Sequence, residues 1–194
     1  MALETRTGEI IVENGRVLQA RQVPSPNFGP RPDGCVPELL VIHNISLPPG
    51  QFGGECIERL FTNCLDWSEH PFFEEIRGTR VSSHLLVRRC GELVQFVNLG
   101  ERAWHAGQSC YAGRDNCNDF SIGIELEGTD DEAYTAVQYE VLAAVTRSLL
   151  AHYGTLDGSR IVGHSDIAPG RKTDPGPAFD WAALRRRLGA ADRC

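Results

Sequence analysis

Short apolar runs separated by polar and glycine-rich stretches predict five main strands along the chain. The clearest run is Leu39–Ile42, four consecutive apolar residues that predict a buried central strand. Alternation of apolar and polar residues predicts another strand at 120–127, where Ile122, Ile124 and Leu126 share one face. The full set of predicted strands is 39–42, 84–89, 93–97, 120–127 and 160–163, with 84–89 and 93–97 joined tightly through Cys90-Gly91.

Helical periodicity predicts three helices, at 55–65, 136–152 and 181–188. In the longest, Thr135 and Gln138 fit a capping box and the apolar stripe is formed by Val137, Val141, Leu142, Val145, Leu149 and Leu150. Asp180 is the expected N-cap of the last helix. Strands interleaved with helices predict an α/β fold, a single domain over 1–194 with a central mixed β-sheet flanked by helices.

The connections carry their own signals. Asn14-Gly15 lies between the apolar runs Ile10–Val12 and Val17-Leu18 and predicts a tight hairpin. Residues 23–37, rich in Pro, Gly and Asn, are expected to form an extended surface segment. Residues 46–54 contain two prolines and three glycines and predict an irregular loop.

Composition narrows the classes of partner. The chain has 194 residues, 41% hydrophobic and 23% charged, with a net charge of −7. An acidic balance of this kind gives no electrostatic basis for binding nucleic acid or an anionic membrane, and Arg185–Arg187 is expected to be the exposed face of the last helix. The first residues lack the apolar core of a signal peptide, and no run reaches the roughly 18 apolar residues of a membrane span. The expected location is therefore the cytoplasm.

Seven cysteines, an odd number without a Cys-x-x-Cys spacing, favour neither a disulfide framework nor a cysteine-based zinc site. We expect them to be reduced and mostly small buried apolar residues. Cys110 and Cys117 flank a glycine-containing loop and are the one pair positioned to form a bond on oxidation.

Two histidines follow predicted buried strands. His43 comes after Leu39–Ile42 and His164 after Ile161-Val162-Gly163, while Asp174 follows in a proline-stiffened loop. Strand ends are where α/β folds place their sites, and two imidazoles with one carboxylate leave an open position on a zinc ion. The alternative is that both histidines are structural and that Asp174 only caps its loop. Spacing alone favours this alternative, because the set is not a tight motif.

The strand at 121–127 shifts the balance toward a site. Its second face presents Ser121, Gly123, Glu125 and Glu127. A solvent-facing strand explains the two acids but not the two small residues, because glycine weakens a strand unless something approaches closely. A ligand cleft against this face explains all four.

Five long motifs follow one another along the chain: Leu39–Gly50, Arg80–His84, Ala103–Gly107, Asn118–Thr129 and Gly163–Gly176. Through these motifs, and over about residues 7–188, the chain resembles the AmpD family, whose members are cytoplasmic zinc amidases that act on anhydro-muropeptides. One departure is Asn116, where family members often carry a second arginine.

The resemblance implies one Zn²⁺ per chain, held by His43, His164 and Asp174. It also implies that Glu125 is the general base and then acid, and that Lys172 stabilises the developing oxyanion. Glu127 lies on the same strand face and is the rival base. The implied substrate is a muropeptide, cleaved at the amide between the lactyl group of N-acetylmuramic acid and L-alanine, by a monomer.

Four residues are candidates for substrate binding. Trp104 offers a flat surface to a sugar ring, Asn44 lies beside the first metal ligand, and Arg80 and Arg114 could pair with carboxylates of the peptide. Core packing for Trp104 and plain solvent exposure for the arginines are the alternatives. His84 and His105 are expected to hold site residues in place.

Three other functions remain open at this point. A recognition module would bind muropeptide without cutting it, but it would be expected to lack a metal ligand or the glutamate, and all five positions are present. An exported amidase acting on polymeric wall would carry a signal peptide. A regulatory partner of another enzyme would need a basic or apolar patch that the sequence does not display.

Overall fold

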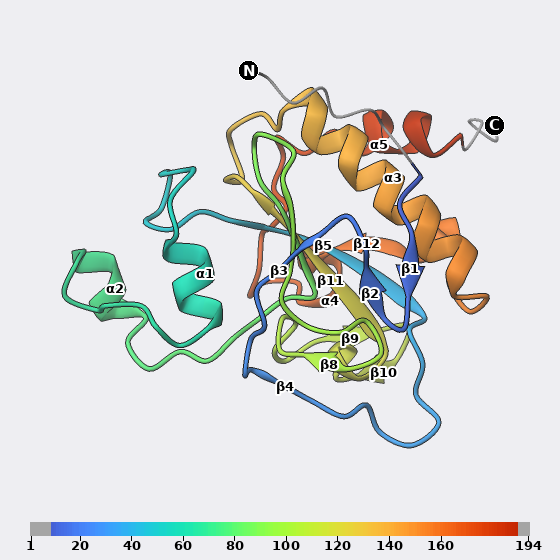
Figure 1. Ribbon diagram of the computed structural model, residues 1–194, viewed down its shortest axis with the longest axis horizontal. Coiled ribbons are helices and arrows are strands. Elements are labelled where there is room, and N and C mark those ends of the chain that lie inside the picture. Colours follow the sequence, from blue (N-terminus) through green and yellow to red (C-terminus); the bar gives the residue numbers. More distant parts are fainter. Residues whose placement is uncertain (1–8, 190–194) are drawn as a thin grey trace.

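The computed structural model describes residues 9–189 (Figure 1). These residues include a mixed six-stranded sheet with the strand order β12-β5-β11-β6-β7-β3. The first four strands in this order run parallel, β7 pairs antiparallel with β6, and β3 runs parallel to β7. The strand bounds are β3 (Arg21–Gln22), β5 (Leu39–Ile45), β6 (Leu85–Val87), β7 (Leu93–Gln95), β11 (Ser121–Glu127) and β12 (Ile161–Gly163). The predicted α/β class and mixed sheet are confirmed. The predicted extent of the domain, 1–194, includes 1–8 and 190–194, which lie outside the described residues, and it stays a prediction.

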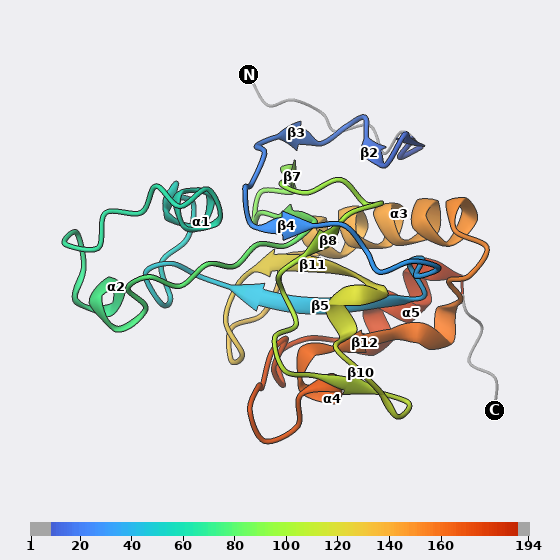
Figure 2. The same cartoon turned by 90° about the horizontal axis from the view of Figure 1, so that it is seen from below.

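β5 and β11 form the centre of the sheet (Figure 2). They pair in parallel over seven residues, from Ser121 beside Leu39 to Glu127 beside Ile45. The predicted strand at 39–42 is therefore too short, because β5 continues through His43 to Ile45. Its extension matters for the site, since it sets Glu125 directly beside His43 on the neighbouring strand.

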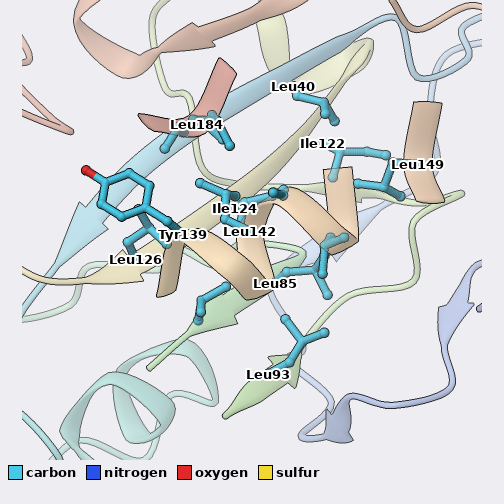
Figure 3. Close-up of a cluster of buried hydrophobic side chains, with 14 of the residues drawn as sticks. Leu40, Leu85, Leu93, Ile122, Ile124, Leu126, Tyr139, Leu142, Leu149 and Leu184 are labelled. Carbon is cyan, nitrogen blue, oxygen red and sulfur yellow. The ribbon is translucent and has the colours of Figure 1, made fainter. Parts of the chain in front are cut away.

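One face of the sheet packs against α3 (Ala136–His152) and α5 (Trp181–Leu188), as Figure 3 shows. Ile122, Ile124 and Leu126 of β11 lie in this core with Leu142 of α3 and Leu184 of α5. The predicted helix bounds are confirmed, as is the capping box in which Thr135 Oγ1 accepts from the Gln138 backbone N–H. This face is dry, so the alternating residues of β5 and β11 point to the other side.

The opposite face carries two smaller clusters. Residues of α1 (Cys56–Phe61) and α2 (Pro71–Glu75) pack with Leu86 and Phe96, and both helices lie together at one side of the molecule (Figure 1). Leu39 and Val41 pack with Phe120 and with Ile167 of the short helix α4 (His164–Ile167).

The helix α1 ends earlier than the predicted 55–65. Asn63 has a positive φ of 60°, which an α-helix does not allow, so the chain leaves the helix after Phe61. The helix α2 was not predicted. In it, Pro71 occupies the first turn and the His70 ring accepts a hydrogen bond from the Phe72 N–H.

Short pairings complete the molecule. The Asn14-Gly15 hairpin is confirmed, with β1 (Val12–Glu13) against β2 (Arg16–Val17) and positive φ at both turn residues. Unpredicted two-residue strands pair β4 (Phe28–Gly29) with β8 (Arg102–Ala103) and β9 (Cys110–Tyr111) with β10 (Arg114–Asp115).

Residues 23–37 are extended, but the prediction that they lie at the surface is only partly right. Ser25 and Asn27 are buried, because both bond to the Phe61 carbonyl at the end of α1 and Asn27 also bonds to that of Val81. Side-chain hydrogen bonding to backbone thus draws a proline-rich, polar segment inward.

The expectation that the cysteines are mostly buried is wrong. Among the described cysteines, all six are free thiols and only Cys117 is buried, with Cys64, Cys90 and Cys110 exposed; Cys194 lies outside the described residues. Within residues 9–189, no helix has the length and apolar character needed to cross a membrane.

Candidate metal and catalytic site

The three predicted metal ligands come together on the sheet face opposite α3. His43 lies in β5, His164 begins α4 directly after β12, and Asp174 lies in the loop that follows α4. Because β5 and β12 are parallel neighbours, with Gly163 beside Ile42, both histidines reach the same edge of the sheet. The loop returns to them, and the Ser165 N–H donates to the Asp174 carbonyl at 3.0 Å.

Their ligand atoms form a tight triangle. His43 Nδ1 lies 3.0 Å from His164 Nδ1, and Asp174 Oδ2 lies 3.0 Å from the first nitrogen and 3.1 Å from the second. Atoms bonded to one tetrahedral zinc at about 2.0–2.1 Å would lie roughly 3.3 Å apart, which is close to this spacing. These residues could therefore hold a metal, and they are the one His/Cys/Asp/Glu group of residues 9–189 with such a geometry.

Proton placement supports a cation between the three atoms. His164 Nε2 faces the Ala106 carbonyl oxygen at 3.1 Å, and a carbonyl only accepts, so Nε2 carries a proton. In the tautomer that carries its one proton on Nε2, the Nδ1 atom of His164 presents a lone pair toward the Asp174 carboxylate, which also only accepts. Two acceptors 3.1 Å apart repel one another unless a cation lies between them. The donor set, two imidazole nitrogens and a carboxylate oxygen, suits zinc.

Burial and pairing set the charge states of these groups. Burial lowers the pKa of His43 to about 4, so the ring is neutral at pH 7. Burial raises the pKa of the Asp174 carboxyl group, but the close contacts with His164 and His43 lower it by more, so the pKa lies below its usual range. Neutral imidazoles and an ionised carboxylate are the forms that bind a metal.

Glu125 lies beside this triangle with an unusual environment. Its side chain is 8% exposed, and its Oε2 atom is buried without a hydrogen-bond partner among the described residues. Burial, together with the negative charge of Asp174, raises the pKa of Glu125 well above its ordinary value, while Lys172 acts in the opposite direction. A carboxyl group with a raised pKa and a free oxygen suits proton transfer.

Glu127, the rival base, is fully engaged in holding the structure. Its carboxylate accepts hydrogen bonds from the backbone N–H groups of Gly53 at 2.6 Å and Arg89 at 3.0 Å, and it pairs with the Arg88 guanidinium. No oxygen is left free for a substrate or a water. The geometry thus separates two glutamates that the strand pattern places on one face.

The small residues of this face have a different cause from the one expected. A Cβ on Gly123 would lie 2.5 Å from ring atoms of His105, and the Ser121 hydroxyl lies 3.1 Å from His105 Nε2. The close approach is therefore made by a buried side chain of the protein, and the explanation of Ser121 and Gly123 as part of a ligand cleft is wrong.

Lys172 is exposed at the edge of the site. Its charge lowers the pKa of both His43 and Glu125, which places the ammonium group within electrostatic reach of both. Its backbone N–H donates to the Ala168 carbonyl and continues the turn that begins in α4. The role predicted for the Lys172 side chain stays a prediction.

The four predicted substrate residues lie in different surroundings. Asn44 follows His43 and donates to Asp130 Oδ1 at 2.8 Å, and Trp104 is half-buried directly before His105. Arg80 is exposed on the segment before Ser82. Arg114 pairs with Glu38 at 3.0 Å and stacks over the Phe120 ring. Glu38 precedes β5, at the opposite end of that strand from His43, so the structure gives the prediction for Arg114 no support.

Three further residues, for which the sequence predicts no role, bond to residues next to the triangle: Asp130, Arg171 and Asn118. Arg171 donates to the Ala106 and Gln108 carbonyls, and Asn118 accepts from two N–H groups next to the histidines. Asn118 lies inside one of the motifs shared with the AmpD family, and that position was the available signal. The role predicted for His105 is to hold site residues in place, and its Nδ1 atom lies 2.9 Å from His43 Nε2.

Comparisons with known proteins identify the family of this chain. The family model described as N-acetylmuramoyl-L-alanine amidase matches residues 33–177. The 1,6-anhydro-N-acetylmuramyl-L-alanine amidase AmpD of Escherichia coli is 60% identical over 176 residues, covering 91% of this chain and 96% of that protein.

Solved structures show the same relationship. A crystal structure of a selenomethionine AmpD derivative aligns with a TM-score of 0.90 at 55% identity, covering 92% of this chain and 99% of the other. AMPDH3 from Pseudomonas aeruginosa, solved in complex with an anhydromuramic pentapeptide, aligns with a TM-score of 0.57 at 30% identity, covering 78% and 59%. The chain therefore belongs to the N-acetylmuramoyl-L-alanine amidase family.

Proposed function

We propose that this amidase hydrolyses the amide between the lactyl group of 1,6-anhydro-N-acetylmuramic acid and L-alanine, using one zinc ion held by His43, His164 and Asp174. This is the activity for which the AmpD amidases are named. The chain is 60% identical to the AmpD of Escherichia coli. The observation that carries the metal assignment is the triangle of two Nδ1 atoms and one carboxylate oxygen at 3.0–3.1 Å.

The zinc ion would supply a Lewis acid that acidifies a water and polarises the scissile carbonyl. Glu125 is proposed to take the proton of the attacking water and then deliver it to the nitrogen of L-alanine as the amide breaks. Its raised pKa suits this exchange, because a carboxylate with an ordinary pKa holds a proton too weakly at pH 7 to return it.

Lys172 is proposed to stabilise the negative charge that develops on the carbonyl oxygen. Its ammonium group acts electrostatically on both Glu125 and His43, so it lies near the reacting atoms while remaining open to solvent. Asn44 and Trp104, which flank His43 and His105 in the chain, are proposed to contact the sugar and lactyl part of the substrate. Arg80 is proposed to contact the stem peptide, and Arg114 has no comparable support.

Cleavage of a soluble muropeptide in the cytoplasm, by a monomer, is an extension of this proposal that rests on the resemblance to the AmpD family. The elution of the protein from a size-exclusion column with light-scattering detection tests the monomer. The substrate preference tests the proposed role in recycling.

The decisive experiment is mass spectrometry of the products formed from anhydro-muropeptide and, separately, from intact peptidoglycan. We expect the zinc-loaded protein to release free peptide and anhydro-sugar from the small substrate. Treatment with a chelator should abolish the release, and one equivalent of zinc should restore it. Activity unchanged after complete metal removal would refute the zinc assignment, and cleavage of intact wall alone would refute the recycling role.

A further inference from the structure

The segment His105–Ala106 contacts both histidines of the metal triangle, and one buried side chain holds that segment. We infer that Asn118 is a positioning residue for the metal site, acting through His105 and Ala106 on the orientation of His43 and His164. This inference rests on the proposed metal site. It adds a residue that touches neither ligand and for which the family resemblance implies no role.

The first step concerns the hydrogen bonds that fix the His43 ring. His43 Nε2 lies 2.9 Å from His105 Nδ1, and His105 Nε2 lies 3.1 Å from the Ser121 hydroxyl. That hydroxyl donates to the Cys117 carbonyl at 2.6 Å, so it accepts from His105 Nε2–H. His105 Nδ1 is then the acceptor for the His43 Nε2 proton, which leaves the lone pair of His43 Nδ1 for the metal.

The second step concerns His164. Its Nε2 proton is donated to the Ala106 carbonyl at 3.1 Å, which fixes the ring so that Nδ1 faces Asp174. The same carbonyl accepts from Arg171 Nη2 at 2.6 Å. Adjacent residues of one segment thus fix both rings, through the side chain of His105 and the backbone of Ala106.

The third step is the hold on that segment. Asn118 Oδ1 accepts from the backbone N–H groups of His105 at 3.0 Å and Ala106 at 2.8 Å. Asn118 is 6% exposed and lies in the 3₁₀ turn η1 (Cys117–Asp119), whose carbonyls at Asn118 and Asp119 accept from Arg31. Without Asn118 Oδ1, two buried N–H groups would lose their acceptor, and the segment would shift to find another.

A shift of this segment would be transmitted to the ligands because there is little free space around it. The His105 ring packs so closely on β11 that a Cβ at Gly123 would lie 2.5 Å from it. Movement of the backbone at 105–106 therefore moves the ring and the carbonyl together, and loosens the triangle formed by His43, His164 and Asp174.

The test is zinc affinity, measured by competition with a chromophoric chelator on the folded protein. Asn118→Leu, which keeps the shape but removes the acceptor, is expected to weaken zinc binding about 10-fold, the lower end of the effect of losing a group that bonds a metal ligand directly. Asn118→Asp keeps an acceptor at the same place and is expected to restore most of the affinity. The absorption spectrum of the cobalt-substituted protein should change with Asn118→Leu and not with Asn118→Asp.

Asn27→Leu is the matched control. Asn27 is also buried and also bonds to backbone, at Phe61 and Val81, but to segments that carry no metal histidine. Asn27→Leu should lower the free energy of unfolding without changing the zinc affinity. If Asn118→Leu does not fold, Asn118→Ser carries the same comparison, because its shorter side chain cannot reach both N–H groups.

The outcomes separate this inference from the function it rests on. If the parent protein binds zinc and the Asn118 variants without the acceptor bind it equally tightly, the inference is overturned and the proposed function stands. If Asn27→Leu weakens zinc binding as much as Asn118→Leu, the effect is one of general stability and the inference is likewise overturned. If the parent protein binds no zinc, both fail.

Discussion

Two glutamates on the same face of β11 differ in the hydrogen-bond donors that surround their carboxylates. Glu125 and Glu127 have the same side chain and the same orientation on β11. Glu127 has three donors around its carboxylate, whereas Glu125 Oε2 has none among the described residues. A buried carboxyl oxygen without a partner is costly to the fold, and such costs are typical of functional sites.

We therefore expect Glu125→Gln to lower kcat by roughly 10²–10⁴-fold while leaving zinc affinity and stability nearly unchanged. The amide keeps the size of the side chain but cannot accept and return a proton. Steady-state kinetics with anhydro-muropeptide, together with a zinc titration, would measure both quantities.

Glu127→Gln is the matched variant and should show the reverse pattern. It weakens the contacts to Gly53 and Arg88, so it should lower the free energy of unfolding while turnover of the folded protein is retained. Full turnover by Glu125→Gln, with loss in Glu127→Gln, would exchange the two roles assigned here.

At the scale of elements, an ion-pair network joins the strand that carries Glu125 to α1 and the loop before it. Arg88 pairs with Glu127 of β11 and Glu58 of α1, and it donates to the Gly54 carbonyl. Arg21 of β3 also pairs with Glu58, at 2.6 Å. The loop that contains Gly54 follows β5, the strand that carries His43. Because Arg88 bonds to the Gly54 carbonyl, the network also holds this loop in place.

We expect Arg88→Leu to lower the free energy of unfolding by about 3 kcal/mol, measured by urea denaturation. Arg88 is 6% exposed, and its removal leaves the charges of Glu127 and Glu58 partly uncompensated in a buried place. Arg77→Leu breaks an exposed pair with Glu74 and should leave the free energy nearly unchanged. An equally small effect for both variants would show that the buried network contributes no more than a surface pair.

At the scale of the whole molecule, three buried histidines tie stability to pH. Burial lowers the pKa of His43 to about 4 and of His84 to about 3, and that of His105 well below its usual value. In the unfolded chain each ring titrates near 6.5. Between about pH 6.5 and these lower values the unfolded state binds protons that the folded state does not, so acid favours unfolding.

His84 allows this to be tested without touching a metal ligand. Its Nδ1 accepts from the Gly123 N–H and its Nε2 faces the Glu101 carbonyl, contacts that a glutamine can reproduce. The free energy of unfolding should fall with decreasing pH less steeply in His84→Gln, by up to about 1.4 kcal/mol per pH unit below pH 6. Urea denaturation of parent and variant between pH 7 and pH 5 gives the two slopes. Identical slopes would mean that His84 binds a proton as readily in the folded protein as in the unfolded chain.

Several elements could be predicted from the sequence because their signals are local. The helix at 136–152 has a capping box and an apolar stripe, and the hairpin at Asn14-Gly15 has residues that tolerate positive φ. β11 alternates over its full length. In contrast, α1 and the strands β6 and β7 are shorter than predicted, and α2 and the two-residue strands β3, β4, β8, β9 and β10 were missed. The residues at which these elements begin and end depend on the segments, distant in the sequence, that pair with them.

The same division holds for the site. Periodicity and strand ends by themselves brought forward His43, His164 and Asp174, but they left a structural interpretation open, because sequence spacing does not show whether lone pairs converge. Only the tertiary structure placed three acceptor atoms 3.0–3.1 Å apart, left Glu125 without a partner and surrounded Glu127 with donors. Local sequence determines backbone conformation and which face of an element is apolar. The partners of a buried polar atom come from segments as far apart as His43 and Asp174, and only the packing of the whole chain decides them.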